Sequence, residues 1–180
     1  GLCEAVCPVA LSPKNLFWAA RQEAVRRGEI DINAYRYLFP DRKYTVMSYY
    51  REHHGIRYDH LAGPGASPHA LFPGCVLLTY APALVEELYH HLQANLGTLT
   101  LLTDCCGLPL AQLGLEERAR RFHQAREEKL KHSRVKNLYL ACPNCYYLLR
   151  ERLAHRGINL FTVYEALDMA KLPRGGGQVI

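Results

Sequence analysis

Apolar runs that suit β-strands alternate with helical patterns from residue 69 onward, and this alternation constrains the fold more than any other feature. The runs are rich in apolar and β-branched residues, whereas the segments between them repeat apolar residues at helical spacing. Such an alternation is typical of a parallel sheet whose strands are joined by crossover helices. We therefore expect an α/β fold with an open parallel sheet. The predicted strands are 70–73, 98–103, 137–141, 159–163 and 178–180.

The first third of the chain has a different pattern. Ser12 and Pro13 form a helix start, with Ser12 as the N-cap, and a helical pattern follows as far as Gly28. Residues 29–62 are rich in Tyr, His and Arg and predict short helices, and the Gly- and Pro-rich stretch 63–68 marks a boundary. We expect a helical connector over 11–66 and the main domain over 67–180.

Five of the seven cysteines directly follow predicted strands. Cys75 comes after the first strand, Cys105 and Cys106 after the second, and Cys142 and Cys145 after the third. Because the carboxyl ends of parallel strands meet at one edge of a sheet, where open α/β sheets bind their ligands, we expect these five thiols to converge.

The spacing of these cysteines favours a metal or cluster site over disulfides. Their odd number and the adjacent pair Cys105 and Cys106 do not suit a disulfide scaffold, so we expect reduced thiols. Cys142 and Cys145 form a C-x-x-C step at a predicted helix N-terminus, which favours thiolates. Structural zinc takes four ligands and leaves one thiol over, whereas a multi-iron cluster accommodates five. Gly107 permits the tight backbone that a cluster requires.

Three short motifs contain the five cysteines: Gly74-Cys75, Cys105-Cys106-Gly107-x-Pro109 and Ala141-Cys142-Pro143-Asn144-Cys145. Together they resemble the cysteine-rich CCG domain found in the catalytic subunit of heterodisulfide reductase and in related iron–sulfur oxidoreductase subunits, and the resemblance covers about residues 69–170. It implies a Rossmann-like domain that binds a noncubane [4Fe–4S] cluster through the five cysteines, with Gly107 beside the cofactor. Zinc is the minor alternative.

The first ten residues are similar to another family. Cys3-x-x-x-Cys7-Pro8 resembles the last part of a ferredoxin run, C-x-x-C-x-x-C-x-x-x-C-P. The resemblance implies that Cys3 and Cys7 are ligands of ferredoxin-type 4Fe–4S clusters that are incomplete in this chain. We therefore expect a ferredoxin-derived segment over 1–10 that belongs to a longer protein, in which a second CCG repeat follows residue 180.

These resemblances imply an iron–sulfur subunit of a heterodisulfide-reductase-like oxidoreductase, which carries electrons to its cluster or reacts there. Implied partners are other redox subunits: a flavoprotein or ferredoxin-type donor, and a membrane anchor subunit. Two alternatives stay open, a zinc-stabilised interaction domain and a metal-free thiol–disulfide oxidoreductase that uses Cys142 and Cys145. Whether the chain is itself an enzyme also stays open.

Composition narrows these options. Apolar residues make up 49% and charged residues 22% of the 180 residues. The net charge of +5 is spread along the chain, so we expect no nucleic-acid partner. We find no apolar stretch of about 18 residues that would span a bilayer, and expect a cytoplasmic protein, at most peripheral to a membrane complex. The basic residues of the helix predicted at 115–130, Arg118 and Arg126 among them, are expected on a solvated face.

Overall fold

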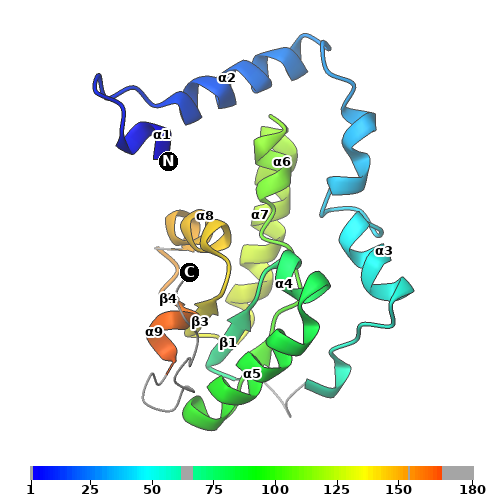
Figure 1. The fold of residues 1–180 in the computed structure, drawn as a ribbon, viewed down its shortest axis with the longest axis vertical. Helices are drawn as coiled ribbons and strands as arrows, with labels where there is room; N and C mark the ends of the chain where they lie inside the picture. Colours follow the sequence, from blue (N-terminus) through cyan, green and yellow to red (C-terminus); the bar gives the residue numbers. More distant parts are fainter. Residues whose placement is uncertain (1, 62–66, 154, 168–180) are drawn as a thin grey trace, which may run out of the picture. The chain divides into compact units, whose positions relative to one another are not determined.

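The computed structural model describes residues 2–61, 67–153 and 155–167 (Figure 1). The chain forms two compact units. Residues 1–57 and 105–133 make up the first, here called the helical unit, and residues 58–104 and 134–180 make up the second, here called the sheet unit. The predicted boundaries after residues 10 and 66 stay predictions.

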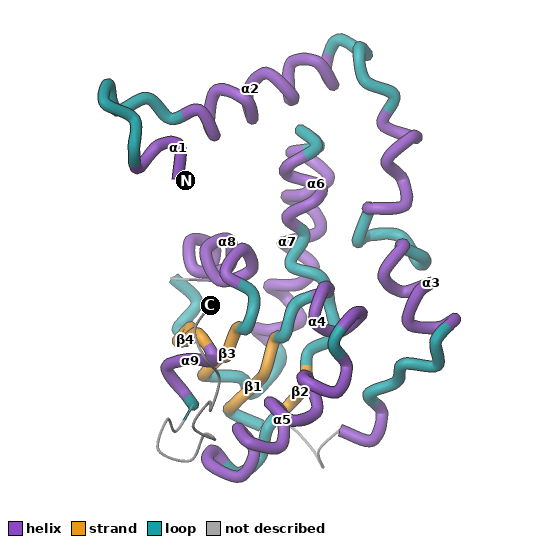
Figure 2. Tube along the Cα trace, viewed as in Figure 1, coloured by secondary structure: helices purple, strands orange, loops and turns teal. Residues whose placement is uncertain are grey.

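The sheet unit contains four parallel strands in the order β2-β1-β3-β4 (Figure 2). Two of them, β1 (His69–Phe72) and β3 (Asn137–Leu140), lie at the centre and have three buried residues each. This continuous burial is typical of parallel strands that are covered on both faces. The edge strands are β2 (Thr100–Leu101) and β4 (Asn159–Thr162). The predicted open parallel sheet is thus confirmed.

Helices follow the strands of the sheet unit. Each of the first three strands leads toward a crossover, and β4 runs directly into a short terminal helix, as the alternating pattern predicts. These helices, with the 3-10 turn that begins the unit, are η2 (Asp59–Leu61), α4 (Cys75–Tyr80), α5 (Pro82–Leu96), α8 (Pro143–Leu153) and α9 (Val163–Ala166).

The core of the sheet unit is organised by the strand register. Leu71 pairs with Leu101 on one side and with Tyr139 on the other, and Tyr139 pairs with Phe161. This row of side chains points to one face of the sheet, where it packs against α5 in a cluster that includes Tyr89, Leu92, Leu99 and Val163. Side chains alternate along a strand, so the buried Ala70, Phe72, Leu138 and Leu140 point to the opposite face.

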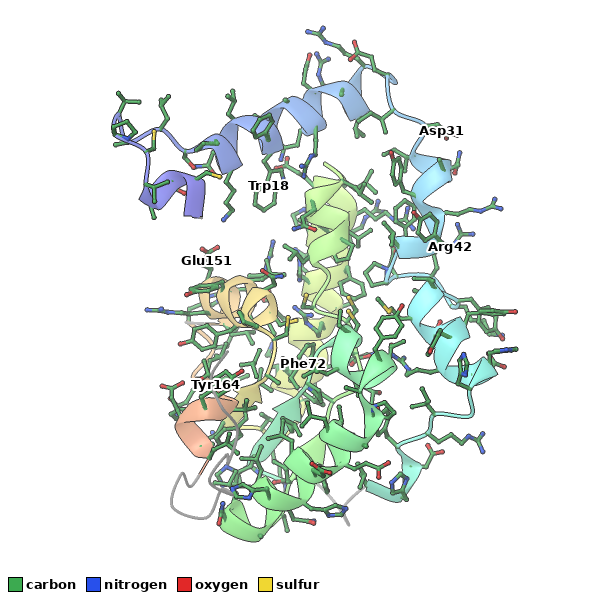
Figure 3. All side chains as sticks on the ribbon, viewed as in Figure 1. Trp18, Asp31, Arg42, Phe72, Glu151 and Tyr164 are labelled. Carbon is green, nitrogen blue, oxygen red and sulfur yellow. The ribbon has the colours of Figure 1, made fainter. Side chains whose placement is uncertain are left out.

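The helical unit contains four N-terminal elements and the two helices that connect β2 to β3. They are α1 (Leu2–Ala5), α2 (Pro13–Arg26), η1 (Ile32–Leu38), α3 (Val46–His53), α6 (Leu108–Gln112) and α7 (Glu116–Lys131). Its core is formed by Phe39, Leu110, Ala111 and Ala119, with Trp18, labelled on α2 in Figure 3, packed against it.

Several element predictions need correction. The second strand is limited to Thr100–Leu101 instead of 98–103, since it lies at the edge and pairs only with β1. Residues 75–80 form α4, a helix that the sequence did not predict. Ser12 precedes α2, but its side chain makes no capping hydrogen bond, and Pro13 supplies the helix start. The strand predicted at 178–180 lies outside the described residues.

No helix in the described part of the chain combines the length and the apolar character needed to cross a bilayer.

Candidate metal centre

The direction in which strands are added to the sheet reverses between β1 and β3. The chain goes from β1 to β2 on one side and then returns to place β3 on the other side of β1. In parallel α/β sheets, the crevice beyond the carboxyl ends of two such strands is the usual ligand site, because the two connections leave in opposite directions. The segments that leave these ends are Pro73-Gly74-Cys75 and Ala141-Cys142.

Gly74 brings these two segments together. Phe72, labelled in Figure 3, ends β1 as a buried residue, and Gly74 follows with φ +87° as the N-cap of α4. A Cβ placed on Gly74 would lie 2.9 Å from the Cβ of Cys142 and 3.5 Å from the Sγ of Cys145. A side chain at position 74 would therefore collide with Cys142. Glycine is also the residue that tolerates this positive φ.

Cys142 is held as a thiolate. The pKa of its thiol is lowered to about 6, chiefly because the Cys145 thiol donates a hydrogen bond to its sulfur. Partial burial opposes this shift, while the backbone N–H groups of Cys145 and Asn144 support it. These N–H groups belong to the first turn of α8, where amides lack helical partners and favour negative charge. At neutral pH the Cys142 sulfur is thus mostly a thiolate, which is the form that ligates metals.

The other two cysteines of the sheet unit differ in exposure. Cys145 has only 2% of its surface exposed, whereas Cys75, the first residue of α4, is half-buried. Cys75 follows Gly74 in the chain, so the same turn that presses against Cys142 presents Cys75 at the carboxyl end of β1. The structure therefore brings the turn that precedes Cys75 against Cys142 and Cys145.

Cys105 and Cys106 begin the second segment of the helical unit. Cys105 is half-buried and Cys106 is buried. Gly107 turns the chain with φ +87° and ψ 0°, and its N–H donates to the Sγ of Cys105 at 3.4 Å. A Cβ on Gly107 would lie 2.7 Å from Cδ1 of Phe122 and 2.9 Å from Cε1 of His123. Gly107 is thus required for close packing of this turn on α7.

Two residues beside this turn were missed by the sequence analysis. Arg126 is buried, and its Nη1 donates to the carbonyl oxygen of Cys105 at 2.9 Å. Its Nη2 lies 3.1 Å from Nδ1 of His123, which is fully buried. The expectation of a solvated face is wrong for Arg126. Arg118 stays partly exposed, but it binds Asp41 through two hydrogen bonds and lies over the ring of Phe39.

The predicted ferredoxin-type ligands lie at the start of the helical unit. Cys3 is exposed in α1, and Cys7 is half-buried in the turn that follows. The N–H of Cys7 donates to the carbonyl oxygen of Glu4 at 3.3 Å. Within the described residues, no three His, Cys, Asp or Glu side chains are already arranged to hold a metal ion.

The residues at the carboxyl ends of β1 and β3 nevertheless suit a thiolate-ligated metal centre. Thiolate sulfur is the donor that zinc and iron–sulfur clusters prefer, and Cys142 provides it at neutral pH. Gly74 supplies the side-chain-free backbone surface against this donor. A cysteine-rich segment of this kind thus has the chemistry for metal or cluster binding.

Comparison with known proteins supports the same conclusion. A family model described as CCG, cysteine-rich domain, matches residues 69–150, a range that contains all five cysteines named above. No curated protein matches the chain, and no solved structure matches it. Residues 69–150 of this chain therefore match the CCG cysteine-rich domain family.

Proposed function

We propose that this chain is an iron–sulfur subunit of a heterodisulfide-reductase-like oxidoreductase, and that its CCG domain binds a [4Fe–4S] cluster of the noncubane type. The proposed ligands are Cys75, Cys105, Cys106, Cys142 and Cys145. The single observation that carries this proposal is the close approach of Gly74 to Cys142 and Cys145, because it joins two of the three cysteine motifs at the usual ligand site of a parallel sheet.

The cysteines after β2 complete the proposed set by their place in the sequence. The strand β2 runs parallel to β1, so its carboxyl end lies at the same edge of the sheet. Residues 102–104 are all that separates β2 from Cys105, and such a linker reaches at most ~14 Å from Leu101 when fully extended. A set of five thiols exceeds the four that tetrahedral zinc takes, and favours a multi-iron cluster.

The chemistry of the bound cluster is the transfer of single electrons. The protein residues have simpler tasks. Cys142 offers a thiolate at neutral pH, Gly74 and Gly107 keep side chains out of the two turns, and the buried Cys145 and Cys106 keep their sulfur atoms away from water.

A metal-free alternative uses the C-x-x-C step alone. The lowered pKa of Cys142 and the hydrogen bond from Cys145 are also features of a dithiol that attacks disulfides. In that reaction the Cys142 thiolate would form a mixed disulfide with the substrate, and Cys145 would displace the second substrate thiol. A thiol reductant would then have to restore the Cys142–Cys145 disulfide to two thiols. This alternative gives no role to Cys75, Cys105 and Cys106.

The partners follow from the resemblance to this class of subunit. We propose a flavoprotein or ferredoxin-type electron donor and a membrane anchor subunit, with the chain on the cytoplasmic side. Cys3 and Cys7 are proposed ligands of ferredoxin-type clusters. If the chain is instead a zinc-stabilised interaction domain, these redox partners are not expected.

The test is a metal and sulfide analysis of protein purified without oxygen, combined with electron paramagnetic resonance. We expect iron and acid-labile sulfide in equal amounts, and a paramagnetic signal that changes with oxidation state. One zinc per chain without iron would overturn the proposal in favour of the interaction domain. Metal-free protein that reduces a model disulfide would overturn it in favour of the dithiol reaction.

A further inference from the structure

Arg126 is a buried cation beside the Cys105-Cys106 step. It lies on the inner side of α7 with 7% of its surface exposed, and its Nη1 donates a 2.9 Å hydrogen bond to the carbonyl oxygen of Cys105. A guanidinium is protonated at every pH at which proteins fold, so the donor in this bond carries a fixed positive charge. Hydrogen bonds with a charged donor are roughly twice as strong as neutral ones.

His123 fixes the orientation of this guanidinium. Arg126 has only donors, so the Nδ1 atom of His123, 3.1 Å from Nη2, must accept. The imidazole is therefore neutral and carries its proton on Nε2. A Cβ on Gly107 would lie only 2.9 Å from Cε1 of this ring, so the ring packs closely against the turn at Gly107.

The same three side chains of α7 support both ends of the turn. Phe122 and His123 contact the backbone at Gly107, and Arg126 holds the carbonyl group of Cys105 while its guanidinium lies 5.9 Å from the ring centre of Phe122. A charge this deeply buried is not needed for solubility, and burial of a cation costs free energy unless it is hydrogen-bonded. Arg126 meets this condition through its hydrogen bonds to Cys105 and His123, so its positive charge is held beside a predicted ligand.

We propose that Arg126 is a positioning residue for the Cys105-Cys106 step, and that its positive charge raises the reduction potential of the cluster those cysteines bind. This inference rests on the proposed function. Reduction adds negative charge to a cluster, so a nearby buried cation stabilises the reduced state more than the oxidised state. Groups that hydrogen-bond to a metal's ligands help to orient those ligands and to tune the metal centre.

The test compares Arg126→Gln with Arg121→Gln in the full chain, purified without oxygen. Both variants remove one positive charge from α7, but Arg121 is exposed and lies 3.6 Å from Glu117. We measure iron content and titrate the cluster with dithionite, following the paramagnetic signal against the applied potential. In Arg126→Gln the ratio of reduced to oxidised cluster at a fixed potential should fall about tenfold, ~59 mV for a one-electron couple. Arg121→Gln should match the wild type.

An Arg126→Lys variant keeps the test decisive if Arg126→Gln does not fold. Lysine retains the charge but has no planar fork to bind Cys105 and His123 together. We expect a potential close to that of the wild type and faster loss of iron to a chelator. Wild-type iron release from Arg126→Lys would overturn the positioning role, and a wild-type potential in folded, iron-loaded Arg126→Gln would overturn the electrostatic role.

The two proposals fail in different ways. Wild-type protein without iron overturns the proposed function and this inference with it. Wild-type protein that holds a normal cluster, next to an Arg126→Gln variant with the same potential and iron content, overturns the role of Arg126 alone.

Discussion

Gly74 approaches Cys142 so closely that a Cβ on Gly74 would lie 2.9 Å from the Cβ of Cys142. Real Cβ atoms do not come this close to another heavy atom, so the turn after β1 and the C-x-x-C step after β3 fit together only through glycine. Since the two strands are sequence-distant neighbours in the sheet, this contact is a product of the topology.

The first prediction separates this contact from backbone strain. Gly74→Ala should lower the free energy of unfolding by about 1–3 kcal/mol, because its φ of +87° suits glycine alone, and should also abolish cluster binding. Gly97→Ala is the matched control, since Gly97 has φ +81° in the same unit but no atom within 4 Å of its Cβ position. It should lose less stability than Gly74→Ala, because it meets only the backbone strain, and it should keep the cluster. Denaturant unfolding and iron analysis measure the two effects, and equal iron loss in both variants would contradict the account.

The second prediction concerns the pH dependence of Cys142. In metal-free protein its alkylation rate should rise with pH around a midpoint near 6, because the thiol loses its proton there. Cys145→Ala removes the hydrogen bond that is the largest cause of the low pKa, so the midpoint should move upward. Cys145→Ser keeps a donor and should move it less. Mass spectrometry of the labelled peptide reports on Cys142 alone, and an unchanged midpoint in Cys145→Ala would refute the assigned cause.

The same pKa has a consequence for stability. The folded-state value is lowered to about 6, so between that pH and the higher pKa of the unfolded chain the unfolded state binds more protons. The contribution of Cys142 to the stability of metal-free protein should therefore increase as pH rises through this window, and disappear as pH falls below about 6. Unfolding midpoints of wild type and Cys142→Ala across this range should diverge toward high pH. Curves that stay parallel would contradict the assignment.

A fourth prediction concerns the helical unit. Arg118 binds Asp41 with two hydrogen bonds and lies 4.1 Å from the ring centre of Phe39, so Arg118→Ala should cost about 1–2 kcal/mol of unfolding free energy. Arg120, on the same helix, pairs with Glu117 at an exposed position, and Arg120→Ala should leave the denaturant midpoint close to that of the wild type. Equal losses of unfolding free energy in the two variants would show that the Arg118–Asp41 pair stabilises the protein no more than the exposed Arg120–Glu117 pair does.

The sequence was sufficient to predict the central sheet. Three-residue apolar runs in β1 and β3, each followed by a motif cysteine, indicated the parallel arrangement, and the structure brings Gly74, next to Cys75, against Cys142. Residues 75–80 were not recognised as α4, because a short Val- and Tyr-containing segment carries no helical periodicity. The length of β2 was overestimated because only Thr100 and Leu101 pair with β1, and the apolar run does not reveal which of its residues will pair.

The surroundings of the cysteines were less predictable. Arg126 and His123 stand in a helix full of charges, where a solvated position is the default for arginine. Their burial depends on the carbonyl group of Cys105, 21 residues earlier in the chain, and on the side-chain-free surface of Gly107. One signal in the sequence could have pointed to them. His123 and Arg126 are polar residues on the same helix face as the inward-facing Ala119 and Leu130.

The most direct test of the central claim is the cluster content of two serine variants at the adjacent cysteines. Cys105→Ser and Cys106→Ser, each purified without oxygen, should lose the paramagnetic signal and most of the bound iron, because each removes a proposed cluster ligand. Cys3→Ser, at an exposed position in α1, should keep both. Wild-type iron content and a normal spectrum in both the Cys105 and the Cys106 variants would contradict the account.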